Sequence, residues 1–396
     1  MNTFKKTNLN FLTIFLENRD LNYFYSRITN LLSRKVEFLN PSATIPDAKK
    51  ILLISDVPGY LNAELCKGSN WQLKKIDTFK GSLINLENYK DETDYLLKTF
   101  SSGRRSKFRT YQKRLEHCFN ITYKTYYGKI DVDEYECLFD QFLELINRRF
   151  DQKQAVNDDL VRWEVYREIA YPLILKKEAC LFVIYDNDKP ISISFNPIQG
   201  KTIFGYIRAY DIDYAKFYIG FTDIIVQLKW CYENHFTVFD LLKGEYEYKS
   251  QWTDTEYYFE KHVIYNSSYT LPFLKAKLII AQIKTIYLLV NLLKKWNLHT
   301  LKGKILSNFR RLTNASKKTN TEYKVTLENN PELPLSQDVE KIEISDYKLV
   351  HIKTHIYNFL YQNQECIDNI AVFNFLNSPN TYFIKGAKNS QKISVN

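Results

Sequence analysis

The side chains best suited to chemistry in this sequence lie in one short run, DLLKGEYEYKSQW, at residues 240–252. Five consecutive positions, 245–249, hold two glutamates, two tyrosines and a lysine. A carboxylate can accept a proton, a phenol can donate one, and an ammonium group can stabilise a developing negative charge. Together these groups suit the transfer of an acyl group to an amine or a hydroxyl. The structural alternative is an exposed, charged turn that Trp252 closes as a core residue.

The elements around this run predict where it lies. An amphipathic pattern at residues 218–236 predicts a long helix, and the apolar residues 236–239 that follow predict a short buried strand. Gly244 then permits a backbone bend that a residue with a Cβ would resist. The run therefore projects from the end of a strand. In α/β sheets, ligands usually bind beyond the carboxyl ends of the strands.

A basic helix and a strand meander precede these elements. Residues 101–116 predict a helix on which Arg105 and Arg109, four positions apart, share a face. Arginine binds oxyanions with its planar fork, so this pair is a candidate anion site, and a solvated helix face is the alternative. Alternating apolar residues and turn residues predict an antiparallel meander of strands at 179–185, 191–196 and 202–209.

Three segments resemble one known family. The run at 240–252 resembles the signature D-x-x-x-G-[DE]-x-x-Y-K-x-x-W of the CelD-type (BioF2-like) acetyltransferase domain. This family belongs to the GNAT superfamily and is related to the FemAB/FemX aminoacyl transferases. Residues 102–116 resemble the arginine-rich helix that opens the domain, and residues 210–227 resemble the segment that leads into its last long helix. The resemblance covers roughly residues 80–255.

The resemblance implies roles for the residues of the run. Lys249 would stabilise the oxyanion or assist the leaving group, because FemX-like relatives use a lysine in the comparable place. Glu245 would act as the base, and Tyr248 as the acid that protonates the departing thiolate. Asp240 is expected to anchor the turn rather than to react, and Trp252 is expected in the core.

The resemblance also implies the acyl donor. In GNAT enzymes the pyrophosphate of acyl-CoA sits at the N-terminus of the helix that begins here near residue 218, where backbone N–H groups and the helix dipole attract anions. The corresponding residues of this chain are Tyr218, Ile219, Gly220, Phe221 and Thr222. The usual glycine-rich loop, Q/R-x-x-G-x-G/A, is absent from this segment. Close packing is the alternative role for Gly220.

The composition is that of an ordinary globular protein. The chain has 396 residues, of which 45% are hydrophobic and 25% are charged, and two or three domains are expected at this length. Its six cysteines are widely spaced and none has the spacing of a zinc site, so we expect a reduced, metal-free cytoplasmic protein. The apolar run at 11–16 ends at Glu17 and makes a poor signal peptide.

Nearly all the excess positive charge lies in one segment. The net charge is +10. Residues 273–311 contain no aspartate or glutamate but nine basic residues: Lys275, Lys277, Lys284, Lys294, Lys295, Lys302, Lys304, Arg310 and Arg311. A basic amphipathic helix is predicted here, and Gln282 and Lys284 interrupt its apolar stretch, which argues against a membrane span. Two interpretations remain: the helix docks on its own domain with the lysines outward, or it lies peripherally on an anionic membrane.

The sequence thus predicts an α+β protein with a mixed sheet, tandem GNAT-like halves and a C-terminal helical or α+β extension. The expected divisions are a degenerate GNAT-like half at 1–100, an acyltransferase domain at 101–268, the basic helical segment at 269–313, and a linker with a small appendix at 314–396.

The expected reaction moves an acyl group, acetyl as the first candidate, from acyl-CoA to an amine or hydroxyl of a sugar or cell-envelope polysaccharide precursor. The expected location is the cytoplasm or the inner face of the membrane, with neither a metal nor a nucleic-acid partner.

Two alternatives to this function remain open. One is FemX-like transfer from aminoacyl-tRNA to a peptidoglycan precursor, with RNA phosphates on the basic segment, although the family's coiled-coil insertion is not evident. The other is a non-catalytic GNAT-shaped binding module, which the missing glycine-rich loop favours.

Overall fold

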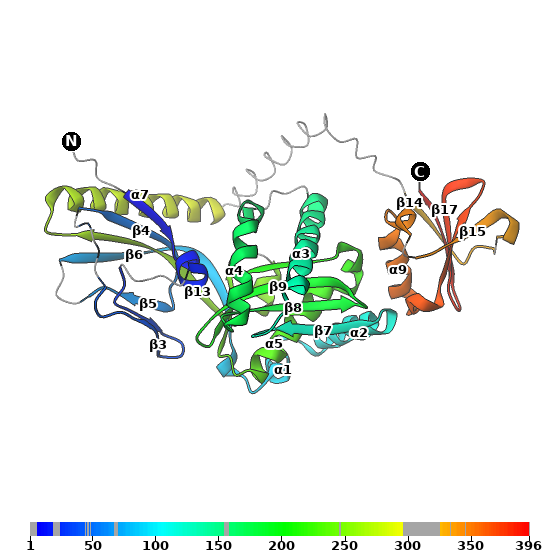
Figure 1. Cartoon of the computed structure of the whole chain (residues 1–396), viewed down its shortest axis with the longest axis horizontal. Coiled ribbons are helices and arrows are strands. Elements are labelled where there is room, and N and C mark those ends of the chain that lie inside the picture. The colour runs from blue at the N-terminus through cyan, green and yellow to red at the C-terminus, as the bar shows by residue number, and fades with distance from the viewer. Residues whose placement is uncertain are drawn as a thin grey trace, which may run out of the picture.

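Ten strands from the N-terminal and central parts of the chain form one mixed sheet, and five strands near the C-terminus form a second, antiparallel sheet (Figure 1). The computed structural model describes residues 6–18, 24–43, 45, 47, 49–66, 70–153, 158–244, 247–295, 325–332, 334–344 and 346–395. The molecule is elongated, and the C-terminal sheet lies at the end opposite to the N-terminal strands (Figure 1). The predicted mixed α+β class is confirmed.

The large sheet has the order β1–β4–β13–β6–β12–β10–β9–β8–β7, and β11 pairs with β9 off this path. Its strands are β1 (Lys6–Asn10), β4 (Ile51–Pro58), β6 (Trp71–Asn85), β7 (Ile121–Tyr126), β8 (Ala179–Asp186), β9 (Lys189–Gln199), β10 (Thr202–Phe204), β11 (Ile207–Tyr210), β12 (Val238–Lys243) and β13 (Thr255–Asn266). The pairs β1–β4 and β10–β12 are parallel, and the remaining pairs are antiparallel. A small separate sheet contains β2 (Arg27–Asn30), β3 (Lys35–Leu39) and β5 (Leu61–Glu64).

The sheet is continuous across residue 100. β6, which precedes this position, lies between β12 and β13, which follow it. In this register Ile84 pairs with Phe239 of β12, and Gly81 pairs with Tyr257 of β13. Backbone hydrogen bonds therefore join regions 1–100 and 101–268 into one sheet, and a separate first GNAT-like half stays a prediction.

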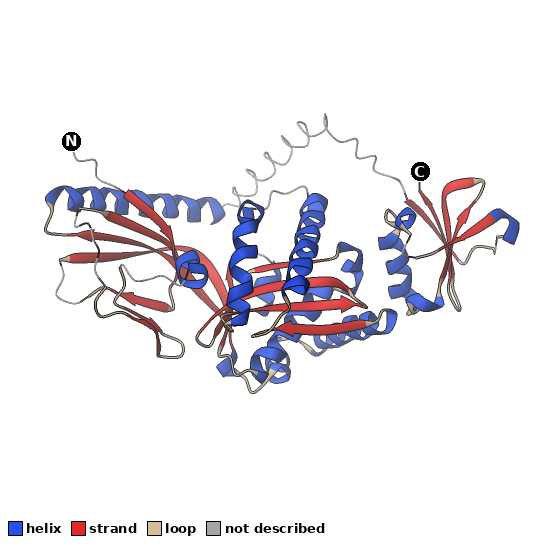
Figure 2. Ribbon diagram, viewed as in Figure 1, coloured by secondary structure: helices blue, strands red, loops and turns tan. Residues whose placement is uncertain are grey.

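Helices cover both faces of the central part of this sheet (Figure 2). They are α1 (Glu92–Thr99), α2 (Ser102–Cys118), α3 (Val132–Lys153), α4 (Trp163–Leu175), α5 (Ile219–Glu233) and the short α6 (Glu247–Trp252). One core cluster holds Phe142 of α3 and Trp163 of α4, and another holds Phe108 of α2. Neighbouring residues of β8 point to opposite faces, with Leu181 in the first cluster and Phe182 in the second. β8 is therefore buried on both sides.

Strand β12 loses its parallel neighbour, β10, towards its carboxyl end. β10 runs parallel to β12 for three pairs, which end at Phe204 and Asp240, and the amide of Gly205 then donates to the carbonyl of Asp240 at 2.8 Å. After this point the chain continues as β11, which pairs with β9. The run at 240–252 thus begins where two parallel strands separate, which is the kind of place where ligands bind in such sheets.

The C-terminal part is a small α+β unit, whereas the sequence left open a helical or an α+β extension. Its elements are β14 (Val325–Asn329), β15 (Val339–Ile342), α9 (Lys353–Asn363), β16 (Ala371–Phe375), β17 (Ser378–Lys385) and β18 (Ser390–Val395). α9 packs on α2 and on the 3₁₀ helix η4 (Ile212–Phe217). The ring of Tyr357 lies 4.8 Å from that of Phe119, and Thr354 donates to the carboxylate of Asp213 at 2.8 Å. The unit is therefore docked on the central domain.

Helix α7 (Thr270–Lys295) lies along the sheet, over β13 and β6 (Figure 1). Ala276, Ile280 and Ile283 are buried against a cluster that includes Leu53 and Val263 of the sheet. The structure thus packs α7 on the large sheet, and the choice between a docked helix and one that also contacts a membrane stays open here. The basic residues 296–311 lie outside the described part.

Candidate functional site

Asp240 ties the end of β12 to two other parts of the large core. Its carboxylate is fully buried and accepts hydrogen bonds from the hydroxyls of Tyr60, at 2.6 Å, and of Tyr257, at 2.8 Å. It also accepts from the amide of Leu242 at 2.7 Å, which bends the chain where Leu242 has a φ of 60°. These contacts suit the anchoring role predicted for Asp240.

Because Asp240 is buried, its contribution to the stability of the fold depends on pH. Desolvation raises its pKa to about 6, although hydrogen bonds from Tyr60, Leu242 and Tyr257 oppose the rise. A carboxyl whose pKa is higher in the folded than in the unfolded chain stabilises the fold while it is protonated, and this contribution is lost as the pH rises through the folded pKa.

We therefore expect Asp240→Asn to flatten the pH dependence of stability in the acid range. Between about pH 4 and pH 6 the wild type should lose on the order of 3 kcal/mol more than the variant, because the asparagine does not titrate. Urea unfolding of both proteins across this range measures the difference. Parallel stability curves would show that Asp240 does not titrate in this window.

Lys249 folds back into the turn instead of projecting from it. Its side chain is buried, and Nζ donates to the carbonyls of Leu241 at 2.6 Å and of Lys243 at 2.8 Å. Gly244, which follows Lys243, has a φ of 124°, which confirms the bend that the sequence predicted for a glycine. Burial lowers the pKa of Lys249 to about 8, while the nearby Asp240 carboxylate opposes this effect. The ammonium group therefore fixes the turn and can lose its proton near neutral pH.

The other two residues of the predicted catalytic group are less fully described. Glu245 lies outside the described residues. Tyr248 is the second residue of α6, but its side chain is also outside the described part. Their roles as base and acid stay predictions. Trp252, which ends α6, is fully buried, as predicted.

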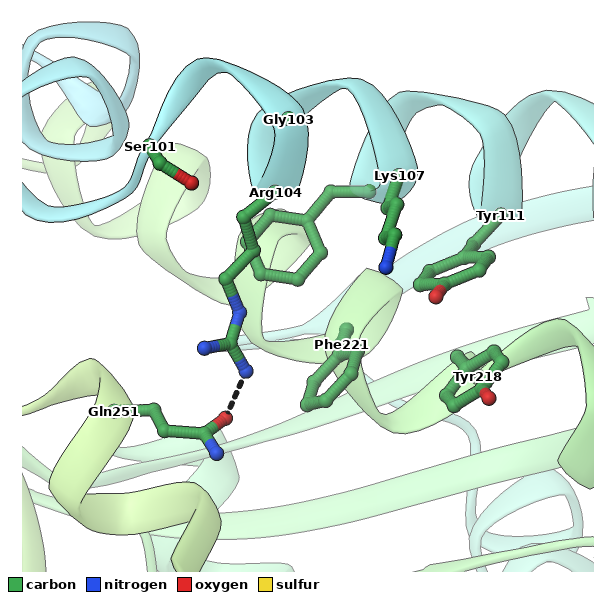
Figure 3. A pocket seen from close by; sticks show the side chains of 9 residues that line it. Ser101, Gly103, Arg104, Lys107, Tyr111, Tyr218, Phe221 and Gln251 are labelled. Atoms are coloured by element: carbon green, nitrogen blue, oxygen red, sulfur yellow. Dashed lines mark hydrogen bonds between the residues drawn. The ribbon is translucent and has the colours of Figure 1, made fainter.

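A cavity of about 640 Å³ lies between α2, the start of α5 and α6 (Figure 3). Its described lining consists of Ser101, Gly103, Arg104, Lys107, Phe108, Tyr111, Tyr218, Phe221 and Gln251. This lining has two cations and no carboxylate. The ring of Tyr111 stacks on that of Tyr218 with centroids 4.2 Å apart, and the guanidinium of Arg104 donates to the side-chain carbonyl of Gln251. The cavity has the volume, positive charge and aromatic surface that an anionic, ring-containing ligand requires.

Only two of the five residues predicted to bind the acyl donor are in the lining of this cavity. Tyr218 and Phe221 line it, whereas Ile219 and Thr222 are buried in the core behind it. A Cβ built on Gly220 would meet a ring carbon of Tyr210 at 3.6 Å, an ordinary contact distance. Tyr218 is the N-cap of α5 and makes no side-chain capping bond. The start of α5 therefore has no side-chain cap, although the amide of Phe221 donates to the carbonyl of Tyr218 at 2.8 Å.

The predicted arginine pair does not line the cavity. The guanidinium of Arg105 donates to the carbonyls of Phe100 and, at 3.3 Å, of Leu97, so it holds the C-terminal end of α1. Arg109 is exposed on another side of α2. Arg104 and Lys107 face the cavity instead, and the sequence analysis missed them. Their spacing of three, continued by Tyr111, was the signal that could have revealed this face.

A buried polar network supports the start of α5. The Asp223 carboxylate accepts hydrogen bonds from Ser194 at 3.1 Å and from Gln227 at 2.9 Å, and it lies 3.4 Å from the Arg208 guanidinium. Burial raises the pKa of Asp223, although Arg208 opposes the rise. Arg208 also reaches the carbonyl of Gly220 at 3.5 Å. This network fixes α5 to β9 and β11 and was not predicted from the sequence.

No cluster of three or more His, Cys, Asp or Glu side chains that could hold a metal occurs among the described residues. The six cysteines are free thiols.

Comparisons with known proteins give one family match and several similar solved structures. Residues 102–250 match the family model described as "Acetyltransferase (GNAT) domain". FemX is similar in structure, with 12% identity, a TM-score of 0.37, and coverage of 53% of this chain and 71% of FemX. L-PGS from Bacillus licheniformis has 12% identity, a TM-score of 0.34, and coverage of 58% and 72%. A conserved protein of unknown function from Bacteroides thetaiotaomicron has 13% identity, a TM-score of 0.36, and coverage of 55% and 70%.

No curated protein matches this sequence. The family match begins at the first residue of α2 and ends within α6, so it contains nearly all the elements that line the cavity. The three segments on which the family resemblance was based also lie within or beside it. Residues 102–250 of this chain therefore belong to the GNAT acetyltransferase family, in its CelD/BioF2-like branch.

Proposed function

We propose that this protein transfers an acyl group, acetyl as the first candidate, from acyl-CoA to an amine or hydroxyl of a sugar or cell-envelope precursor. The observation that carries the proposal is the cavity at the start of α5, inside the GNAT domain, with Arg104 and Lys107 in its lining. A donor with several phosphate groups needs such a cluster of cations, and the described lining offers no carboxylate that would repel it.

Three features of this cavity suit the donor. The planar fork of Arg104 can bind two phosphate oxygens, and Lys107, one helical turn further along, adds a second cation. The start of α5, which has no side-chain cap, adds the positive end of the helix dipole. The rings of Tyr111, Tyr218 and Phe221 offer an apolar surface for an adenine ring.

The chemical step belongs to the neighbouring turn at 244–252. The acceptor attacks the thioester carbon, a tetrahedral oxyanion forms, and the sulfur leaves with a proton. Such enzymes gain mainly by positioning the reactants and by stabilising the oxyanion. We assign this stabilisation to the turn that Lys249 holds, with Glu245 as the base and Tyr248 as the acid. The pKa of Lys249, lowered to about 8, makes its proton available near neutral pH.

Acetyl-CoA is expected to raise the melting temperature of the wild type. A ligand present at about a hundred times its Kd adds roughly 2.7 kcal/mol of stability. The double variant Arg104→Ala with Lys107→Ala should lose most of this shift, because each side chain contributes a cation to the cavity. The matched control is Arg109→Ala with Lys113→Ala, two exposed cations of the same helix that do not line it.

The same assay distinguishes the other candidate functions. Stabilisation by a charged tRNA in place of acetyl-CoA would favour an aminoacyl transferase. Stabilisation by neither ligand would contradict the proposal and favour a binding module without catalysis.

A further inference from the structure

The face of α7 that points away from the sheet is apolar. Since a helix turns about 100° per residue, the positions opposite to the buried Ala276, Ile280 and Ile283 are occupied mainly by leucines. These are Leu271, Leu274, Leu278, Leu289 and Leu292, and all of them are exposed, Leu278 by 71%. Contiguous apolar surface of this kind is uncommon on soluble monomers and marks a surface that contacts a partner or a membrane. The lysines were expected to point outward; Lys275, Lys277 and Lys284 are exposed, but leucines occupy the centre of the outward face.

The lysines of α7 border this apolar stripe. By the same helical geometry, Lys277 and Lys284 follow one edge of the stripe, and Lys275 lies at the other. The sequence contains no aspartate or glutamate from residue 261 to residue 321. A stripe of leucines between rows of lysines is the pattern of a helix that lies in the interface of an anionic bilayer, with its apolar side in the acyl region and its cations at the phosphates.

A groove beside α7 adds cations from another element. It has a volume of about 560 Å³ and is lined by Lys74, Lys75, Ile76 and Asp77 of β6 and by Lys284, Tyr287, Leu288, Asn291 and Leu292 of α7. Lys74 of β6, which shares a face of the strand with Ile76, and Lys284 of α7 thus supply cations to this groove, next to leucines of the helix. Lys75 is not counted with them, because its ammonium group donates to Asn62 of β5 at 2.7 Å. This mixture of cations and apolar groups suits the head group and upper acyl chain of an anionic phospholipid.

The packing of α7 decides between crossing a membrane and lying on it. Residues Thr270–Leu293 form a helix that is, by length and composition alone, long and apolar enough to span a bilayer. However, spanning would remove Ala276, Ile280 and Ile283 from Leu53 and Val263 of the sheet. A docked helix that keeps these contacts can only lie flat, with its opposite face in the lipid.

We infer that α7 is an interfacial helix that binds this protein to the surface of an anionic phospholipid bilayer, through its outward leucines and the lysines of α7 and β6. Pairing of two copies through the same face is less favourable, because the described helix carries lysines without a carboxylate to match them, and a two-fold contact would bring like charges together. This inference does not depend on the proposed reaction, since it concerns a surface outside the GNAT domain.

Sedimentation of the full chain with lipid vesicles tests the inference. We expect the wild type to bind vesicles of phosphatidylcholine that contain phosphatidylglycerol at low salt, to bind pure phosphatidylcholine weakly, and to be released at high salt. Lys277→Glu with Lys284→Glu should weaken binding at least about tenfold. The matched control is Lys341→Glu with Lys388→Glu, which changes the net charge equally on exposed residues of the C-terminal unit and should bind like the wild type.

A second pair of variants tests the apolar stripe. Leu274→Ser with Leu278→Ser should reduce binding at low salt, whereas Leu39→Ser with Leu335→Ser, at exposed leucines elsewhere, should not. Two results would overturn the inference: failure of the wild type to bind anionic vesicles at low salt, or a dimer in sedimentation equilibrium that only the α7 leucine variant dissociates. Acetyl-CoA binding by the same variants reports separately on the proposed function.

Discussion

Replacing Trp252 by alanine is expected to lower the free energy of unfolding by about 3–5 kcal/mol, the largest effect on stability that we predict. The indole is fully buried where α6 meets α1, α2 and α5. It stacks on Phe108 with centroids 5.4 Å apart and meets the ring of Phe100 at 4.9 Å. Removal of this ring leaves a cavity that neighbouring rings cannot fill without moving. Urea unfolding followed by circular dichroism measures the loss.

Trp252→Phe is the matched control for this prediction. It keeps an aromatic ring in the cluster and removes an indole N–H that is buried without a hydrogen-bond partner among the described residues. Its cost should therefore be clearly smaller than that of the alanine variant. An alanine variant that unfolds at the wild-type urea concentration would contradict the account of α6 as an element anchored by its last residue.

Lys249→Ala is expected to lower the rate of acyl transfer by one to three decades, about 1.4–4 kcal/mol of barrier. The ammonium group holds the carbonyls of Leu241 and Lys243, so its loss releases the turn that carries the proposed base and acid. If its charge also stabilises the oxyanion, the wild-type rate should fall as the pH rises above about 8, the pKa of Lys249, and the variant should lack this fall. Release of CoA from acetyl-CoA, with an amino sugar as acceptor, measures both.

The neighbouring Lys243 supplies the control. It lies on the same turn, but its side chain is half-exposed and pairs with Asp56 at 2.8 Å. Lys243→Ala should keep turnover within a few-fold of the wild type. A Lys249→Ala protein with normal turnover and an unchanged pH profile would remove Lys249 from the mechanism.

The local elements around the site could be predicted from the sequence. The helix expected at 218–236 is α5 (Ile219–Glu233), the strand that follows is β12 (Val238–Lys243), and Gly244 bends as required. Apolar periodicity and turn residues determine structure over a few positions, so these elements can be recognised in the sequence itself. The family resemblance added a GNAT domain of the CelD/BioF2-like family, which the family match over residues 102–250 confirms.

The parts that depend on distant contacts could not be predicted in the same way. The insertion of β6 between β12 and β13 joins residues more than a hundred positions apart, and no local pattern encodes it. The burial of Lys249 was also not predicted, although its two carbonyl partners lie only 8 and 6 positions away, because no periodic pattern marks a lysine that folds back into its own turn. The choice of Arg104 over Arg105 depends on the rotation of α2, which the burial of Phe108 fixes.

The most direct test of the account is a calorimetric titration of acetyl-CoA into the wild type and into the Arg104→Ala, Lys107→Ala double variant. We predict saturable binding by the wild type and affinity at least about tenfold lower in the variant, since a hydrogen bond to a charged group contributes roughly 1.5–3 kcal/mol. The Arg109→Ala, Lys113→Ala control should bind like the wild type. Equal affinity in the wild type and the double variant, or no binding by the wild type, would contradict the claim that this cavity holds the acyl donor.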